Sequence, residues 1–597
     1  MYIAPVGEIA FAVKHVAGFK ASMDAGEFGD LTEDLLDAIL AEAGRFASEE
    51  IAPLRRVGDQ IGAKLVDGKV STPPGWRELY RRWIAGGWNG LQAPEQYGGQ
   101  ALPTVLGVAA LEMWNSGSMA FGIGPTLTMG AIEAIDAHAS EELKQLYLPK
   151  LTAGEWMGTM NLTEPHAGSD LAAVKCRAEP AGDGSYRLFG QKIFITYGEH
   201  DFCDNIIHLV LARLPDAPPG SSGLSLFLVP KFTVNVDGTL GPRNDVFCSG
   251  LEHKLGIRGS PTCTMVFGDG SSNGVPAGAR GWLIGEQHRG LACMFTMMNN
   301  ARLAVGIQGV AVAEAAFQMA RAYATERQQG KVSGGDTVVA IVHHPDVQRN
   351  LLTIKAMTAA ARAICYSCAF AIDKARMSDG TARQFWKDHA DLLTPIAKAF
   401  STDVGVEATS IAVQVFGGMG YIEETGVAAL YRDARIAPIY EGTNGIQAID
   451  LVTRKLSLGS GKHVDLLLDD LSETARQLSN SGRPAAEESA DVLKAAIRHL
   501  RAATTFLRTA AHEGRKSEAL AGAVPYLRLF ALTLGGVYLA RAALSGGSEA
   551  RTSLFHFYLH NVLSEADGLH RQILLGGKSV GSAARYLAAP DAVTAVN

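Results

Sequence analysis

The stretch IAPIYEGTNGIQ, residues 436–447, places a single carboxylate, Glu441, between an aromatic residue and a glycine in otherwise uncharged surroundings. Pro438 tends to end a preceding helix, because proline lacks an N–H donor and restricts the residue before it. The two glycines allow a tight turn, and either Thr443 or Asn444 is a good N-cap for a helix that follows. We therefore predict that Glu441 lies on a loop between two helices.

Two roles are open for Glu441 from these residues alone. In apolar surroundings a carboxylate is desolvated, which raises its pKa toward the range that suits a general base. Alternatively, Glu441 is an acid near the start of a helix, where the helix macrodipole stabilises its charge. The local sequence does not decide between these roles.

The composition is typical of a globular protein of several domains. The chain has 597 residues, of which 47% are hydrophobic and 19% charged, and it is too long for one core. A net charge of −7 repels phosphate, so we expect no nucleic-acid partner. Charges or glycines interrupt every long apolar run, and residues 1–20 lack a signal-peptide pattern. We therefore expect no membrane insertion and a bacterial cytoplasmic location.

The cysteines and histidines form no clear metal or redox motif. Cys365 and Cys368 make a C-x-x-C sequence, but they lie in an alanine-rich helical run with no second pair nearby. We expect both to be buried helix residues with reduced thiols. His343 and His344 are expected in a loop just before a helix, so the sequence predicts no metal site.

Helical and strand patterns divide the chain into four predicted domains. Residues 1–155 are expected to form helices and residues 156–285 a set of short strands. Residues 286–455 form a second helical set, which contains Glu441, and residues 456–597 a third without a recognisable chemical motif. The predicted fold class is α+β multidomain: an N-terminal helical domain, a middle antiparallel β-domain, a C-terminal helical bundle and an additional C-terminal helical domain.

Several elements can be placed more closely. Strands are expected at residues 186–189, 192–197, 206–211, 224–229 and 262–267, and long helices at 294–324, 345–376 and 398–416. Residues 119–135, rich in small and apolar side chains, either line a narrow acyl pocket or pack against other helices. No segment alternates strands and helices, and no G-x-G-x-x-G follows a strand, so a dinucleotide cofactor would need another architecture.

Separate stretches, all in the same order, resemble the motifs of the acyl-CoA dehydrogenase family over residues 30–455. They are WNGL (88–91) with PEQYGG (94–99), MNLTEPHAGSD (160–170), GQKIFIT (190–196), KLGIRGS (254–260), ERQQG (326–330), QVFGG (414–418) and YEGT (440–443). Their shared order makes the resemblance far more specific than any one stretch. The extra C-terminal helices resemble the longer bacterial members, among which those acting on 3-methylthiopropionyl-CoA are nearest in layout.

The resemblance implies FAD as the cofactor, held between the middle β-domain and the third domain. The residues expected to contact the flavin are Leu162, Thr163, Ser169, Phe194, Ile195, Thr196 and Thr443. Many members have tryptophan where Phe194 stands, and phenylalanine keeps the aromatic wall. Five more residues are expected to reach the ADP half of FAD in a neighbouring subunit: Arg327, Gln329, Gln414, Gly417 and Gly418. A homodimer is therefore expected.

The resemblance also assigns the catalytic base to Glu441. Some members place the base earlier, just before the arginine of NNAR (299–302), but Ala301 stands there and cannot accept a proton. Substrate contacts are expected from Ser169, Asn299, Arg302, Tyr440 and Gly442. Many members have an aspartate where Asn299 stands.

The implied reaction converts an acyl-CoA thioester to the trans-2-enoyl-CoA. Glu441 would remove the α proton while the β hydrogen leaves as hydride to flavin N5, and donors such as the Glu441 amide would meet the enolate oxygen. The expected electron acceptor is an electron-transfer flavoprotein. The expected substrate is 3-methylthiopropionyl-CoA or a fatty acyl-CoA.

Two alternatives remain at this point. An acyl-CoA oxidase would use the same base but pass electrons to oxygen, and the sequence does not report oxygen access. A flavin-containing DNA-binding protein of the alkylation-response type would carry a basic cluster in its C-terminal extension. In this extension acidic residues are interspersed with the basic ones, namely Asp465, Asp469, Asp470, Glu487, Glu488 and Asp491.

Overall fold

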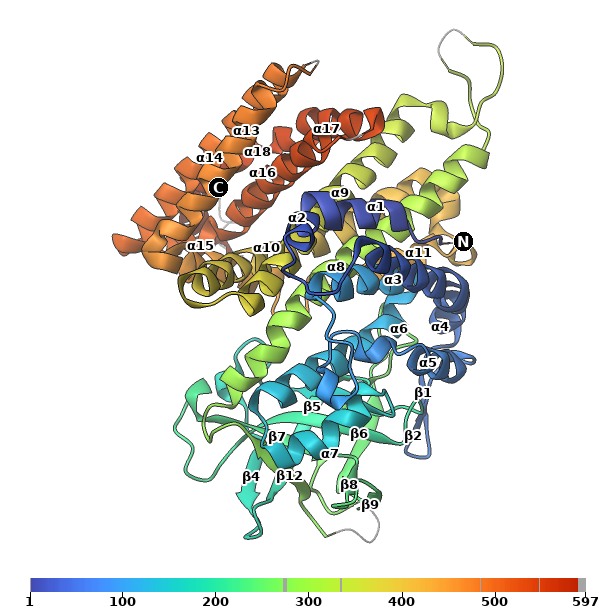
Figure 1. Cartoon of the computed structure of the whole chain (residues 1–597), viewed down its shortest axis with the longest axis vertical. Helices are drawn as coiled ribbons and strands as arrows, with labels where there is room; N and C mark the ends of the chain where they lie inside the picture. The colour runs from blue at the N-terminus through green and yellow to red at the C-terminus, as the bar shows by residue number, and fades with distance from the viewer. Residues whose placement is uncertain (1, 272–275, 333–334, 484, 547, 589–597) are drawn as a thin grey trace, which may run out of the picture. The chain divides into compact units, whose positions relative to one another are not determined.

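The computed structural model describes residues 2–271, 276–332, 335–483, 485–546 and 548–588 (Figure 1). These residues form two compact units. The first contains residues 42–304 and the first few residues of the chain, and the second contains residues 305–588 together with residues 5–41. The structure confirms the predicted α+β class, with strands in the first unit and long helices in the second.

The helices that precede the sheet cover much of the predicted N-terminal domain. They are α1 Val6–Phe11, α2 Phe19–Asp24, α3 Glu33–Phe46, α4 Arg55–Ile61, α5 Trp76–Ala85, α6 Thr104–His138 and α7 Glu141–Thr152, with a hairpin of β1 Lys64–Val66 and β2 Lys69–Ser71. Residues 119–135 lie in α6, where most side chains are buried. Trp114 of α6 and Trp76 and Trp83 of α5 are fully buried, and Trp83 contacts Trp114, so aromatic packing forms the core here.

The strands of the first unit form one main sheet. They are β3 Trp156–Asn161, β4 Arg177–Pro180, β5 Tyr186–Thr196, β6 Asn205–Arg213, β7 Leu224–Pro230, β10 Val246–Leu251, β11 Thr262–Phe267 and β12 Ala279–Ile284, beside a small pair of β8 Phe232–Val234 and β9 Leu240–Arg243. The order of the sheet is β10-β11-β5-β12-β7-β6-β3, and β4 pairs with β5 and β6. Its buried faces are lined with valine, leucine and isoleucine.

Two features of this sheet differ from the prediction. β3 runs parallel to β6, and β4 meets β6 in a parallel pairing at one position, whereas the sequence predicts antiparallel pairing throughout. Parallel neighbours need a long crossover connection, which local turn signals do not reveal. The two strands expected at 186–189 and 192–197 form one strand, β5, that continues through Gly190 with φ of +144°. A side chain at Gly190 would approach Cys176 to 3.0 Å, so glycine is needed there.

Long helices dominate the second unit, although the first of them begins within residues 290–304 of the first unit. They are α8 Gly290–Glu326, α9 Pro345–Met377, α10 Gly380–Phe416, α11 Val427–Ala434 and α12 Asn444–Thr453, followed by α13 Lys462–Ser479, α14 Ala486–His512, α15 Lys516–Ala521, α16 Ala523–Leu544, α17 Glu549–Asn561 and α18 Ala566–Ala588. The helix expected from residue 398 begins earlier, at Gly380, because Pro395 does not end it. α8 and α10 approach so closely that a Cβ on Gly309 would lie 2.1 Å from the Ser401 carbonyl oxygen.

The C-terminal helices pack on the bundle of the same chain. In Figure 1, α14 and α18 lie alongside α16, and α16 packs in turn on α9, α10 and α12. Gly535 of α16 approaches Ala360 of α9, and Arg528 donates to Glu407 of α10 at 2.6 Å. The N-terminal segment joins the same unit, since Phe19 meets Phe370 edge-on and Lys374 pairs with Glu27 at 2.6 Å.

Among the described residues, two helices are long and apolar enough to cross a membrane by length and composition, namely α8 and α16. Of their most apolar windows, 83% and 89% respectively is buried within the protein, as in core helices. Glycines and charged residues do interrupt the apolar runs of these two helices, as expected from the sequence. These interruptions still leave each helix apolar enough, on average, to pass a test of length and composition.

We predict that His208 of β6 makes the stability of the first unit fall in mild acid. His208 is buried and shares a hydrogen bond of 2.7 Å with Thr159, and burial lowers its pKa to about 3. Below its ordinary pKa of about 6.5 the unfolded chain therefore binds a proton that the folded chain does not. The free energy of unfolding should decrease from about pH 6.5 downward, until the folded histidine also titrates.

Urea unfolding at pH 7 and pH 5.5 tests this prediction. His208→Gln should lose about 1 kcal/mol less stability than the wild type over this interval. His560→Gln, which alters an exposed histidine, should behave like the wild type. Equal losses in all three proteins would contradict the assignment of His208.

Candidate functional site

Glu441 lies between two helices, as predicted. α11 ends at Ala434 and α12 begins at Asn444, and the Thr443 hydroxyl caps α12 by accepting the N–H of Ile446 at 3.2 Å. The preceding turn closes on itself, because the N–H of Tyr440 donates to the Ile436 carbonyl at 3.1 Å. Proline and capping chemistry, both readable in the sequence, therefore set the two ends of the loop.

The carboxamide of Asn444 fixes this loop to α10. Its Nδ2 donates to the Ala399 carbonyl at 3.1 Å and to Asp403 Oδ1 at 2.8 Å, while its Oδ1 accepts from Lys398 Nζ at 2.9 Å. Lys398 is fully buried, and burial also raises the pKa of Asp403. The sequence identifies Asn444 only as a possible cap. The residues next to Asn444 in the sequence do not indicate that its side chain links α12 to α10 by both donating and accepting hydrogen bonds.

Tyr440 holds the loop from its other side. Its hydroxyl donates to the Gln308 side chain of α8, and burial raises the pKa of the phenol, so Tyr440 stays neutral. Between these anchors Glu441 has φ of +58° and Gly442 has φ of +81°. A non-glycine residue with positive φ costs on the order of 1–3 kcal/mol and is kept where the surroundings determine it. Glu441 is half-buried in its own unit.

In the first unit, a buried ion pair positions the loop after β3. Lys192 of β5 and Glu164 are both buried and lie 2.9 Å apart. Lys192 also donates to the Leu162 carbonyl at 2.9 Å, and Glu164 accepts the N–H groups of Lys175 and Cys176. Burial opposes ionisation of Glu164, but Lys192 and these donors outweigh it, and its pKa lies below the ordinary value.

The same ion pair brings two predicted groups together. The N–H of Ile193 donates to the Thr163 carbonyl at 2.9 Å, so the loop after β3 lies against the end of β5. At this end Phe194 has φ of +62° and is 58% exposed, while Ile195 is buried and Thr196 is half-buried. Ser169 is exposed farther along the loop. An exposed aromatic ring on strained backbone is unusual and indicates a surface that something else covers.

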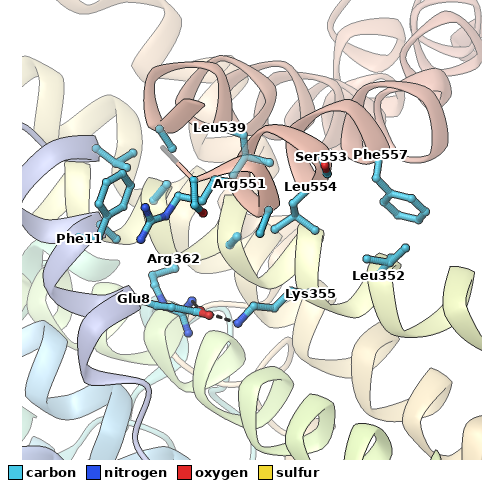
Figure 2. A pocket seen from close by; sticks show the side chains of 17 residues that line it. Glu8, Phe11, Leu352, Lys355, Arg362, Leu539, Arg551, Ser553, Leu554 and Phe557 are labelled. Carbon is cyan, nitrogen blue, oxygen red and sulfur yellow. Dashed lines mark hydrogen bonds and ion pairs between the residues drawn. The ribbon is translucent and has the colours of Figure 1, made fainter. Parts of the chain in front are cut away.

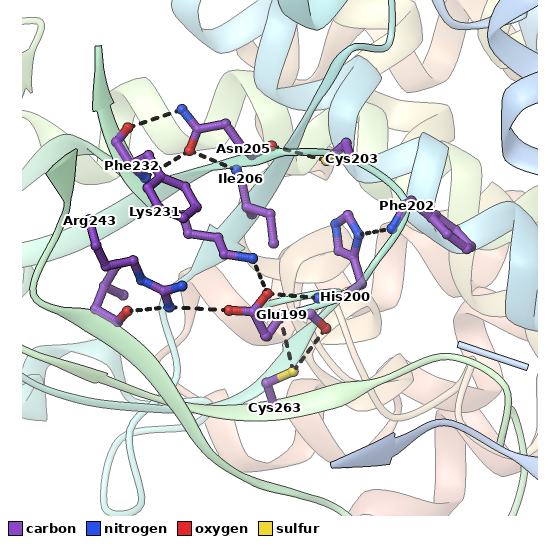
Figure 3. Close-up of polar contacts among 11 residues, drawn as sticks. Glu199, His200, Phe202, Cys203, Asn205, Ile206, Lys231, Phe232, Arg243 and Cys263 are labelled. Carbon is purple, nitrogen blue, oxygen red and sulfur yellow. Dashed lines mark hydrogen bonds and ion pairs between the residues drawn. The ribbon is translucent and has the colours of Figure 1, made fainter. Parts of the chain in front are cut away.

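The turn that follows β5 is held by a second polar cluster, shown in Figure 3. Glu199 accepts from Lys231 and pairs with Arg243 at 3.4 Å, and its main-chain N–H donates to the Cys263 thiol at 3.3 Å. Tyr197, fully buried with φ of +52°, donates its hydroxyl to the Ala120 carbonyl at 2.9 Å. The strained end of β5 is therefore fixed on both sides. Lys192, within β5, and Glu199, just after it, carry charges whose partners are distant in the sequence, so local sequence patterns assign neither of them a role.

The remaining predicted residues occupy two helix regions. Arg302 of α8 is buried, its guanidinium lies 5.5 Å from the Phe295 ring, and it donates to the exposed Asn299 at 3.4 Å. Five residues lie exposed near the ends of α8 and α10, where Tyr323 and Phe416 stack at 4.2 Å; they are Arg327, Gln329, Gln414, Gly417 and Gly418. A Cβ on either glycine would meet no atom within 4 Å, so this surface is open.

The cysteine and histidine motifs play a structural role. Cys365 and Cys368 are buried in α9, as expected, and Cys365 lies 3.3 Å from the Ser401 hydroxyl. His343 and His344 lie just before α9, where His344 contacts the Gln329 carbonyl at 2.7 Å. Within the described ranges, no group of three or more histidine, cysteine or acidic residues is arranged to hold a metal ion.

Family models match almost the whole chain. The acyl-CoA dehydrogenase N-terminal domain matches residues 33–155, the middle domain residues 159–269 and the C-terminal domain residues 288–456. A fourth model, described as acetyl-CoA dehydrogenase C-terminal like, matches residues 467–583.

Named relatives and a solved structure agree with these matches. The chain is 42% identical over 576 residues to 3-methylmercaptopropionyl-CoA dehydrogenase of Ruegeria pomeroyi, covering 96% of both chains. It is 37% identical over 474 residues to a butyryl-CoA dehydrogenase of Syntrophomonas wolfei, covering 77% of each. An acyl-CoA dehydrogenase from Bacillus anthracis, solved in complex with FAD, has the same fold with a TM-score of 0.73 at 23% identity, covering 94% of this chain and 92% of that one.

We predict that the Lys192–Glu164 pair is energetically important because both partners are buried. Lys192→Met should reduce the free energy of unfolding by about 3–5 kcal/mol, since it leaves an unpaired buried carboxylate. The double variant Lys192→Met, Glu164→Gln should recover part of this loss. Lys150→Met breaks an exposed pair with Glu155 and should cost less than about 1 kcal/mol. A loss in Lys192→Met no larger than that of this control would disprove the prediction.

Proposed function

Because the chain belongs to the acyl-CoA dehydrogenase family, whose members are FAD-dependent oxidoreductases, we propose that Glu441 is the base that removes the α proton of an acyl-CoA. The observation that carries this proposal is the loop of Glu441, which has a strained backbone and is anchored on both sides by Asn444 and Tyr440. A catalytic group must be held within a fraction of an ångström, and such anchors provide that precision.

The residues present fit an FAD cofactor. An exposed aromatic ring, Phe194, stands beside the half-buried hydroxyl groups of Thr163 and Thr196, which suits a planar ring with polar edges. We assign the flavin to Leu162, Thr163, Ser169, Phe194, Ile195, Thr196 and Thr443. FAD, when bound, supplies the acceptor for the β hydrogen as hydride.

The chain's own groups would carry out the rest of the reaction. The Glu441 carboxylate accepts the α proton, and its main-chain N–H donates to the thioester oxygen as negative charge develops there. Tyr440 and Gly442 lie beside the base and are assigned to the substrate, together with Ser169, Asn299 and Arg302. With Ala301 in place of an acid, the earlier position on α8 offers no carboxylate.

The exposed residues near the ends of α8 and α10 support a homodimer. Arg327, Gln329, Gln414, Gly417 and Gly418 offer a cation, two amides and two open glycines on one surface. We assign this surface to the ADP half of an FAD molecule bound by a partner subunit. The cytoplasmic location and the four-domain division predicted from the sequence remain predictions.

The substrate is assigned from the relatives. The relative that matches over nearly the full length acts, by its name, on 3-methylmercaptopropionyl-CoA, and two relatives with shorter matches act on butyryl-CoA. We therefore propose a short acyl-CoA, with the thioether 3-methylthiopropionyl-CoA preferred, and an electron-transfer flavoprotein as the acceptor.

The C-terminal helices offer little surface for DNA. Several of their arginines pair with nearby aspartates: Arg501 with Asp469 at 2.6 Å, Arg508 with Asp465 at 3.1 Å, and Arg541 with Asp470 at 2.6 Å. Arginines neutralised in this way attract phosphate weakly. This pairing supports an enzyme over the DNA-binding alternative.

We predict that Glu441→Gln binds FAD but does not transfer electrons to it from an acyl-CoA. Proton transfer by a positioned group raises the reaction rate by about 10²–10⁴-fold. Anaerobic bleaching of the flavin by butyryl-CoA should therefore slow by at least about 100-fold. Glu424→Gln, an exposed acid in a nearby turn, should bleach at the wild-type rate. Bleaching of Glu441→Gln at that rate would show that the base lies elsewhere.

A panel of acyl-CoAs tests the assigned substrate and acceptor. Rates of flavin reduction should be highest for 3-methylthiopropionyl-CoA and lower for butyryl-CoA by no more than about 200-fold, because that is the largest selectivity that one methylene provides. Hexadecanoyl-CoA should be a poor substrate. Reoxidation should require electron-transfer flavoprotein, and peroxide equal to turnover in its absence would identify an oxidase instead.

A further inference from the structure

The second unit contains a pocket that none of the predicted catalytic, substrate or FAD residues lines. Its volume is about 540 Å³, and it lies between the N-terminal helix α1 and helices α9, α16 and α17 (Figure 2). This volume falls within the range of roughly 300–1,000 Å³ that is typical of small-molecule sites. Part of its lining precedes the matched family domains, namely Glu8, Phe11, Ala12 and Val16, and part belongs to the additional C-terminal helices, namely six residues between Ser548 and Phe557.

The walls of the pocket are largely apolar. They include Leu539 of α16, Leu554 and Phe557 of α17, Ala359 of α9 and Phe11 of α1. An elongated hydrocarbon chain would bury these side chains from water, each square ångström of apolar surface contributing about 25 cal/mol. The walls therefore suit a ligand with an apolar body.

The charged side chains at the floor of the pocket form ion pairs with one another. Arg362 pairs with the buried Glu314 at 3.0 Å and with Glu8 at 3.7 Å, and Lys355 donates to Glu8 and pairs with Glu314 at 3.4 Å. Figure 2 shows Glu8 and Lys355 pointing toward each other. Lys355 and Arg362 thus face two carboxylates, and neither is available as the main receptor of a ligand anion.

Arg551 differs from these residues. Its guanidinium lies 3.6 Å from the centre of the Phe11 ring, a cation–π contact that orients its donors. Among the charged side chains that line the pocket, Arg551 is the one for which the described residues provide no carboxylate partner. A half-buried arginine beside apolar walls attracts an anion and can bind a carboxylate through two parallel hydrogen bonds.

We propose that this pocket binds a single-chain amphiphilic carboxylate, with its head on Arg551 and its hydrocarbon chain along Ala359, Leu539 and Leu554. A phosphate monoester carries close to two negative charges, whereas Arg551 offers one positive charge, because Lys355 and Arg362 already face Glu8 and Glu314. Because Arg551 of α17 stacks on Phe11 of α1, a ligand head on Arg551 would lie beside both helices and hold the N-terminal segment against the C-terminal helices. This proposal does not depend on the assignment of Glu441.

Calorimetric titration of the FAD-loaded full-length protein with decanoate tests the proposal. Arg551→Gln should bind decanoate at least tenfold more weakly, whereas 1-decanol, which has no charge, should bind both proteins alike. Ala359→Phe, which fills the pocket, should weaken binding of both ligands. Arg571→Gln removes an exposed arginine of α18 outside the pocket and should bind like the wild type. Oxidation of butyryl-CoA should be unchanged in Arg551→Gln.

Amide hydrogen exchange locates the bound ligand independently of affinity. Decanoate should slow exchange in residues 6–16 and 549–561 of the wild type but not of Arg551→Gln. Decanoate affinity unchanged in Arg551→Gln, or protection confined to residues 436–447, would overturn the proposal. Decyl phosphate binding more tightly than decanoate would also contradict it, because it would show that the pocket is built for a phosphate head.

Discussion

One carboxamide, that of Asn444, determines where the main chain of Glu441 lies. Its oxygen accepts from a buried lysine and its nitrogen donates to a main-chain carbonyl and to Asp403, so α10 holds it through three partners. An amide is suited to this position because it offers both donors and an acceptor. The positive φ of Glu441 is an unfavourable conformation that a free loop would relax. The buried hydrogen bonds of Asn444 offset that cost and keep the loop in one shape.

In the first unit, a buried ion pair takes the place of the amide and holds the loop after β3 against the end of β5. Lys192 and Glu164 lie in the interior, where burying an ion pair gives little net stability. The pair sets positions: Lys192 reaches the Leu162 carbonyl, and Glu164 takes two main-chain N–H groups. The loop after β3 and the end of β5 are thereby held side by side, with Phe194 exposed at the end of the strand. In both units, residues that would not themselves react hold the surfaces assigned to the cofactor and the substrate.

The additional C-terminal helices are part of the second unit and share its core. α16 is buried against α9, α10 and α12, and Arg528 ties it to Glu407 of α10. The N-terminal segment closes over the same region through Glu8, Phe11 and Phe19. The pocket beside Arg551 exists only because these distant segments meet. A chain lacking either segment would not form this pocket, because both segments line it.

The sequence by itself determined the features that depend on near neighbours along the chain. Pro438 and Thr443 bound the loop of Glu441, short runs of apolar and β-branched residues place β6, β7 and β11, and the ordered motifs identify the family. Tertiary structure alone decided the rest: the parallel pairing of β3 with β6, the extension of α10 back to Gly380, and the anchors of the loop. Lys398 and Asn444 are 46 residues apart, and Glu8 and Lys355 are 347 apart. The packing of helices and strands in space brings such partners together, and local sequence propensity does not predict that packing.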